Sequence, residues 1–145
     1  MALQTIRVTG HMDSGMTIEM MSGEHKIYMD QPKNSGGADL GPAPPALILA
    51  AYAGCVGTIG RLMAHQEKFT LRGMRFEVEA DYDPDRLMGR ETTARAGFQE
   101  MRMKVEIDAD LDMAAKQDLL RRIEERCPIF DNVANETTVT SEVIG

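Results

Sequence analysis

The stretch GPAPPALILAAYAGCVGTIG, residues 41–60, contains no charged side chain, although 27% of the residues in this chain of 145 are charged. The charge-free region is everything between Asp39 and Arg61. We expect a segment that avoids charge in this way to be buried. It carries one of the two cysteines, Cys55. The Cys55 thiol is therefore either inert packing in the core or the reactive atom of the protein.

This stretch predicts a long helix that starts near residues 44–45 and ends between residues 66 and 68. Its apolar residues follow three-and-four spacing, and proline is tolerated in a first helical turn. Small residues fill the other faces, so we expect the helix to be enclosed on all sides. Gly54, Gly57 and Gly60 each cost about 1 kcal/mol relative to alanine in a helix interior. Close packing of a sheet or of a partner helix on the backbone would offset this cost.

The same window could also be read as a membrane span, because about 20 apolar residues are enough to cross a bilayer. Prolines crowd its first part and glycines dilute its second, so the continuous apolar run is about half that length. We therefore interpret it as a core helix.

The remaining sequence predicts strands, two further helices and one long loop. Strands are expected at residues 3–9, in a hairpin over 16–30, and at 71–83, 98–108 and 137–144. Residues 31–42 form the loop. Asp112 is the expected N-cap of an amphipathic helix, and residues 128–136 add a short one. The order of elements predicts an α+β fold with an antiparallel sheet, in a single domain over residues 1–145.

The formal net charge of −7 argues against a nucleic-acid partner and against an anionic membrane surface. The start of the chain, MALQTIRVTG, lacks the features of a signal peptide, so we expect a cytoplasmic location. The two cysteines have no metal-ligand spacing, and the three histidines (His11, His25 and His65) form no metal pattern. We therefore expect no metal and no cofactor. In a reducing compartment a cysteine pair is more often catalytic or redox-sensing than structural.

The second cysteine, Cys127, precedes Pro128. If Pro128 opens a helical turn, Cys127 lies at the N-terminus of that turn, where a thiolate is stabilised. The neighbouring glutamates oppose this effect and Arg126 favours it, so packing and reactivity both stay open for Cys127. The 12 methionines are expected to fill the core or, alternatively, to line a pocket for an apolar ligand.

Two motifs resemble those of the OsmC/Ohr family. PKNSGGADLGPAPPALILAAYAGC, residues 32–55, has the Gly-Gly loop, the G-x-x-P turn and the apolar A-A-x-A-x-C helix of the first-cysteine motif, in that order. ERCPIFDNVANETTVTSEVI, residues 125–144, resembles the second-cysteine motif. GEHKIYMD, residues 23–30, is similar to the hairpin strand before the loop. The resemblance covers essentially the whole chain in order.

The resemblance implies an OsmC-like intertwined homodimer, in which antiparallel sheets wrap around a long buried central helix. It also implies a thiol peroxidase that reduces organic hydroperoxides. Cys55 would be the peroxidatic cysteine and Cys127 the resolving one. The resulting disulfide would be reset by an external dithiol reductant.

The sequence departs from the family pattern at the groups that activate the thiolate. Family peroxidases have an arginine in the N-terminal hairpin and a glutamate early in the central helix. Here no arginine occurs between Arg7 and Arg61, and residues 25–66 contain no glutamate. His11 is the candidate replacement as activating group. The alternative function is an OsmC-like protein without efficient peroxidase activity, which binds an apolar small ligand or senses redox state.

Overall fold

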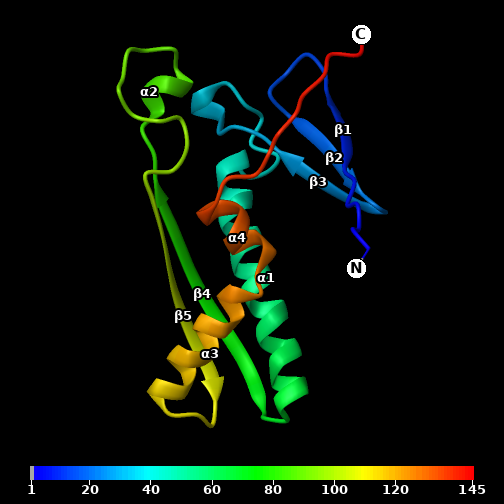
Figure 1. Ribbon diagram of the computed structural model, residues 1–145. Helices are drawn as coiled ribbons and strands as arrows, with labels where there is room; N and C mark the ends of the chain where they lie inside the picture. The colour runs from blue at the N-terminus through cyan, green and yellow to red at the C-terminus, as the bar shows by residue number, and fades with distance from the viewer. Residues whose placement is uncertain (1) are drawn as a thin grey trace. The chain divides into compact units, whose positions relative to one another are not determined.

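The computed structural model describes residues 2–145, and the chain divides into two compact units (Figure 1). The first unit ends at Ile48, and the second is Leu49–Gly145. Each unit is described by itself below. The predicted organisation of residues 1–145 as one domain stays a prediction.

The first unit contains a three-stranded antiparallel sheet in the order β1-β2-β3. Its strands are β1 (Thr9–Met12), β2 (Ile18–Ser22) and β3 (His25–Met29). The hairpin expected over residues 16–30 is confirmed. Gly23 occupies its turn with a φ of 59°, in the left-handed region that glycine adopts without strain.

The first strand was predicted at residues 3–9, and this is wrong. Pairing with β2 begins at Thr9 and continues to Met12, so the strand begins where the predicted one was expected to end. Residues 2–8 have no regular structure and are exposed. Their β-favouring side chains do not form a strand because they have no neighbouring strand to pair with.

The loop after β3 is organised around Asp30, whose side chain is 1% exposed. Its carboxylate accepts hydrogen bonds from the Thr17 hydroxyl at 2.8 Å and from the amides of Gln31 at 2.7 Å, Leu40 at 3.2 Å and Ala38 at 3.3 Å. Burial alone raises the pKa of Asp30, but these hydrogen bonds outweigh it and hold the pKa below its usual value. The loop also contains the short helix η1 (Lys33–Ser35).

Helix α1 (Pro44–Glu67) confirms the bounds that the sequence predicts. One face is buried, and it carries Tyr52, Val56, Ile59, Gly60, Met63 and Ala64. The opposite face, with Gly54, Thr58 and Leu62, is exposed in the single chain. The expectation of a helix enclosed on all sides is therefore wrong for the chain alone, because its own elements cover one face.

α1 is long and apolar enough to cross a membrane by length and composition, a test that a core helix also passes. Its buried residues share one hydrophobic core with residues of the strands and the helix that follow it. One face of α1 therefore packs in the core of the second unit.

The second unit continues with a long antiparallel hairpin of β4 (Leu71–Asp81) and β5 (Glu100–Ala109), which runs beside α1 (Figure 1). The short α2 (Pro84–Leu87) lies in the connection between the two strands. Helices α3 (Met113–Glu125) and α4 (Pro128–Ala134) follow. The predicted N-cap is confirmed, because the Asp112 side chain accepts a hydrogen bond from the Ala115 amide at 2.8 Å.

The glycines of α1 differ in what lies beside them. A Cβ at Gly57 would be 3.2 Å from the Phe76 ring, and one at Gly60 would be 3.0 Å from the Met74 sulfur. Nothing lies within 4 Å of such a position at Gly54. Close packing of β4 therefore accounts for two of the three glycines, whereas Gly54 faces open space.

The last predicted strand, residues 137–144, is wrong for the chain by itself. Residues 136–145 have no regular structure and are exposed. Val139 is 80% exposed and Val143 is 91% exposed. A β-favouring sequence forms a strand only when a neighbouring strand accepts its hydrogen bonds, and none pairs with this segment in the described chain.

Candidate active site

The structure brings together the two cysteines that the sequence singles out. Both are free thiols, on α1 and at the start of α4. Cys55 is partly buried and packs against the core cluster that includes Cys127, which is 1% exposed. The Cys55 side chain lies near enough to Cys127 to raise the pKa of that thiol. The site therefore contains one partly exposed and one enclosed thiol, packed in the same cluster.

Cys127 is the N-cap of α4, and Pro128 is the first helical residue, as the Cys-Pro pair predicts. The Cys127 sulfur accepts a hydrogen bond from the Phe130 amide at 3.3 Å. Burial and the Cys55 side chain nevertheless raise the pKa of Cys127, because the amides of α4 offset only part of their effect. The surroundings of Cys127 therefore disfavour its thiolate form.

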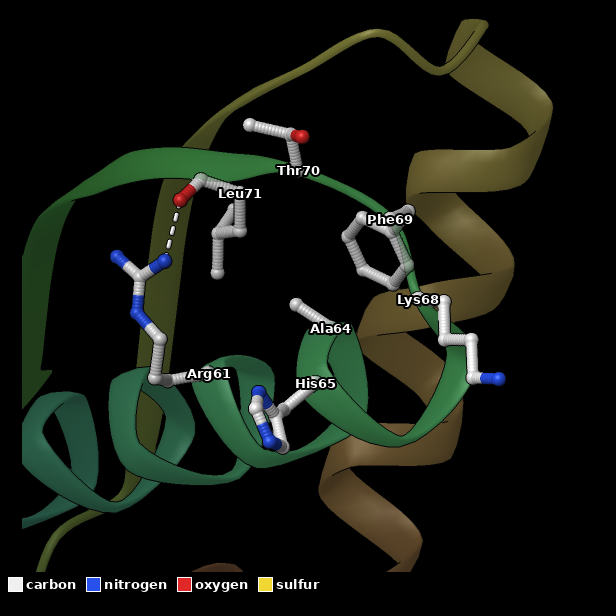
Figure 2. A pocket seen from close by; sticks show the side chains of 7 residues that line it. All are labelled: Arg61, Ala64, His65, Lys68, Phe69, Thr70 and Leu71. Atoms are coloured by element: carbon white, nitrogen blue, oxygen red, sulfur yellow. Dashed lines mark hydrogen bonds between the residues drawn. The ribbon is translucent and has the colours of Figure 1, made fainter.

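The cations nearest to the thiols in sequence are bound elsewhere. Arg61 lies six residues beyond Cys55, about 9 Å along the helix axis, and its guanidinium donates to the Leu71 carbonyl (Figure 2). Arg126 donates to the Gln66 side chain at 3.0 Å. Neither arginine takes the place of the activating arginine of the family pattern.

Sequence reasoning missed a hydrogen-bonded pair beside the thiols. The Tyr52 hydroxyl lies 2.6 Å from a carboxylate oxygen of Glu124, and Tyr52 is 5% exposed. Burial, followed by the hydrogen bond to Glu124, raises the pKa of Tyr52, so Tyr52 stays a neutral donor. A signal exists in the sequence: Tyr52 precedes Cys55 by three residues, and Glu124 precedes Cys127 by three.

His11 lies on β1, in the first unit. Its side chain is 59% exposed, and its ring nitrogen lies 3.7 Å from the Asp13 carboxylate. The role of His11 as activating group stays a prediction. His25 and His65 are also exposed.

A separate pocket of about 450 Å³ lies where α1 turns into β4 (Figure 2). Figure 2 shows seven residues around it, namely Arg61, Ala64, His65, Lys68, Phe69, Thr70 and Leu71. The pocket contains no thiol and is distinct from the cysteine pair. Among residues 2–145, no group of three or more His, Cys, Asp or Glu side chains is placed to hold a metal ion.

Comparison with known proteins assigns the family. A family model described as OsmC-like protein matches residues 36–142, most of the chain. The chain belongs to the OsmC-like protein family. The resemblance of its two cysteine motifs to this family is therefore confirmed. No curated protein sequence matches the chain.

Solved structures with this OsmC-like fold share little sequence with the chain. An OsmC-like protein from Mycoplasma pneumoniae has a TM-score of 0.77 at 19% identity, over 90% of this chain and 88% of that one. An organic hydroperoxide resistance protein OsmC from Legionella pneumophila has a TM-score of 0.67 at 22% identity, over 92% and 91%.

An organic hydroperoxide resistance protein from Elizabethkingia anophelis has a TM-score of 0.67 at 20% identity, over 90% and 88% of the two chains. At these identities the likeness shows the fold alone. The predicted α+β class with antiparallel sheets is confirmed.

Proposed function

We propose that this OsmC-like protein is a thiol-dependent peroxidase that reduces organic hydroperoxides. The observation that carries the proposal is the placement of two free thiols in one cluster, with the more accessible Cys55 on α1 and the buried Cys127 at the start of α4. The names of the Legionella and Elizabethkingia structures, both organic hydroperoxide resistance proteins, support it.

The reaction assigns a different role to each thiol. The Cys55 thiolate attacks one peroxide oxygen, an S–O bond forms, the O–O bond breaks, and the alkoxide leaves as an alcohol after taking a proton. Cys127 then attacks the Cys55 sulfenic acid, an S–S bond forms, and the sulfenic oxygen leaves as water. An external dithiol reduces the disulfide by exchange and restores both thiols.

A second function is favoured by one specific observation. The two arginines nearest to the thiols in sequence have other partners, and burial disfavours the Cys127 thiolate. A thiolate is activated less well when no neighbouring cation stabilises it. The second candidate is therefore an OsmC-like protein without efficient peroxidase activity, which binds an apolar small ligand or senses redox state.

The proposed function includes a cellular location and an oligomeric state. We place the protein in the cytoplasm, where reductants keep thiols free between turnovers. We also propose a homodimer, which the exposed and unpaired β-favouring segment over residues 137–144 supports. The proposal includes no nucleic-acid partner, no membrane partner and no cofactor.

The test treats the reduced protein with one equivalent of cumene hydroperoxide. We expect the loss of both thiols in a thiol titration and an intact mass lower by H₂. Cys55→Ser should not react, and Cys127→Ser should stop at a sulfenic acid that dimedone traps.

Retention of two free thiols after long exposure would contradict the peroxidase. An apolar ligand retained in native mass spectrometry of protein from its own host would then support the second candidate.

A further inference from the structure

The hydrogen bond between Tyr52 and Glu124 joins α1 to α3 one helical turn before each cysteine. The Tyr52 ring centroid lies 5.9 Å from that of Phe130, and the Phe130 amide donates a hydrogen bond to the Cys127 sulfur. Tyr52 is also near enough to Cys127 for the charge of a Cys127 thiolate to raise the Tyr52 pKa. The phenol therefore donates to a carboxylate and belongs to the same core cluster as the buried thiol.

Glu124 differs from Tyr52 in its access to solvent. Tyr52 is buried, whereas Glu124 is partly exposed. A proton that reaches Glu124 can therefore exchange with water, whereas a proton on Cys127, at 1% exposure, cannot do so directly.

We propose that Tyr52 and Glu124 form a proton relay that takes the proton from Cys127 when Cys127 attacks the sulfenic acid on Cys55. This inference rests on the proposed function, because it concerns the second step of the same reaction. It assigns roles to two residues other than the cysteines themselves.

The need for such a relay follows from the surroundings of Cys127. The groups that shift its pKa are Cys55 from α1 and the amides of Phe130 and Ile129 from α4. Tyr52 and Glu124 are the ionisable groups at the neighbouring α1–α3 contact. Burial is the largest cause, and it disfavours the thiolate. Attack requires a thiolate, so a base must accept the proton as the S–S bond forms.

The atoms of the step balance. The Cys127 proton passes to the Tyr52 oxygen, and the Tyr52 proton passes to Glu124. The Cys127 sulfur bonds to the Cys55 sulfur, and the S–O bond of the sulfenic acid breaks. The departing hydroxide takes a proton, which Glu124 returns directly or through water. The net change is one thiol and one sulfenic acid converted to one disulfide and one water.

The experiment isolates the attack by Cys127 from peroxide chemistry. 5,5′-Dithiobis(2-nitrobenzoic acid) converts the accessible Cys55 to a mixed disulfide with release of one thionitrobenzoate. Attack by Cys127 then forms the Cys55–Cys127 disulfide and releases a second thionitrobenzoate, which is followed by absorbance. Cys127→Ser gives the baseline without the second release.

Tyr52→Phe removes the hydroxyl and keeps the ring, and Glu124→Gln keeps an acceptor but removes the base. Each should slow the second release by about 100-fold near neutral pH, which is typical for loss of a general base. In the variants solvent must deprotonate the Cys127 thiol, so the rate of the second release should rise about tenfold per pH unit. The wild-type rate should change less with pH. Tyr82→Phe and Glu91→Gln, at exposed positions, are the matched controls.

Second-release rates within about threefold of the wild-type rate in both variants would overturn the relay. Slower release would also overturn it if the rate depended on pH as in the wild type and the thermal midpoint of the variant were lowered, because the variant would then be structurally damaged. Absence of a second release in the wild type would overturn it as well. A protein that fails to consume hydroperoxide but shows the predicted release contradicts the peroxidase proposal and supports the relay.

Discussion

Asp30 shows how one buried carboxylate fixes a long loop. It accepts three backbone amides and the Thr17 hydroxyl, so residues 31–40 fold back onto a single side chain. Its hydrogen bonds to the charged form exceed the cost of its burial, which is why its pKa is low. The sequence marks this segment as a loop by composition and does not reveal the carboxylate at its centre.

We predict that Asp30→Asn lowers the thermal midpoint by several degrees at neutral pH. An amide offers one acceptor oxygen and directs an NH₂ group at backbone donors. Because the folded pKa of Asp30 is lowered, its contribution is present above the unfolded value of about 4 and is lost as pH falls through the folded value.

Urea unfolding at a series of pH values should therefore show the two proteins converging in acid. Asp39→Asn, in the same loop and exposed, is the control. A stability difference that stays constant through the acid range would contradict this account.

Helix α1 was predictable because its signals are local. The start at Pro44, the three-and-four spacing of apolar residues and the end near Glu67 all lie within one segment. The N-caps at Asp112 and Cys127 were predictable for the same reason. The contact of Tyr52 with Glu124 spans 72 residues, so it depends on how α1 and α3 pack. No local rule gives such a contact.

The glycines of α1 allow a matched test of its two faces. Gly60→Leu would place a side chain against Met74 and Ile123, so we expect the free energy of unfolding to fall by about 3 kcal/mol. Gly54→Leu points into open space within the chain and should preserve the far-ultraviolet circular dichroism.

Chemical denaturation of both variants is the measurement. Equal destabilisation with no change in solution mass would show that the two faces do not differ as described.

The whole molecule leaves apolar and β-favouring side chains without a partner at both ends. Leu3 is 96% exposed, and Ile144 is 92% exposed. The strands predicted at residues 3–9 and 137–144 do not form in one chain, because their local propensity is satisfied only by hydrogen bonds to another strand. Local sequence reports propensity and cannot report which chain supplies the partner.

The homodimer proposal predicts a solution mass of about twice the 16.0 kDa of one chain by light scattering. Truncation after Glu136 removes the unpaired segment and should shift the protein toward the monomer mass. A truncated chain with hydroperoxide activity intact and an unchanged dimer mass would argue against a role for this segment in assembly.

The spacing of the two cysteines has a consequence for how the protein survives oxidation. A bond between Cys55 and Cys127, which are 72 positions apart, would close a loop that contains β4, β5 and α3. Closing a loop of this size removes enough freedom from the unfolded chain to add about 4 kcal/mol of stability. Formation of the disulfide by an oxidant would therefore stabilise the second unit against unfolding during oxidative stress. Reduction of the disulfide would remove this added stability.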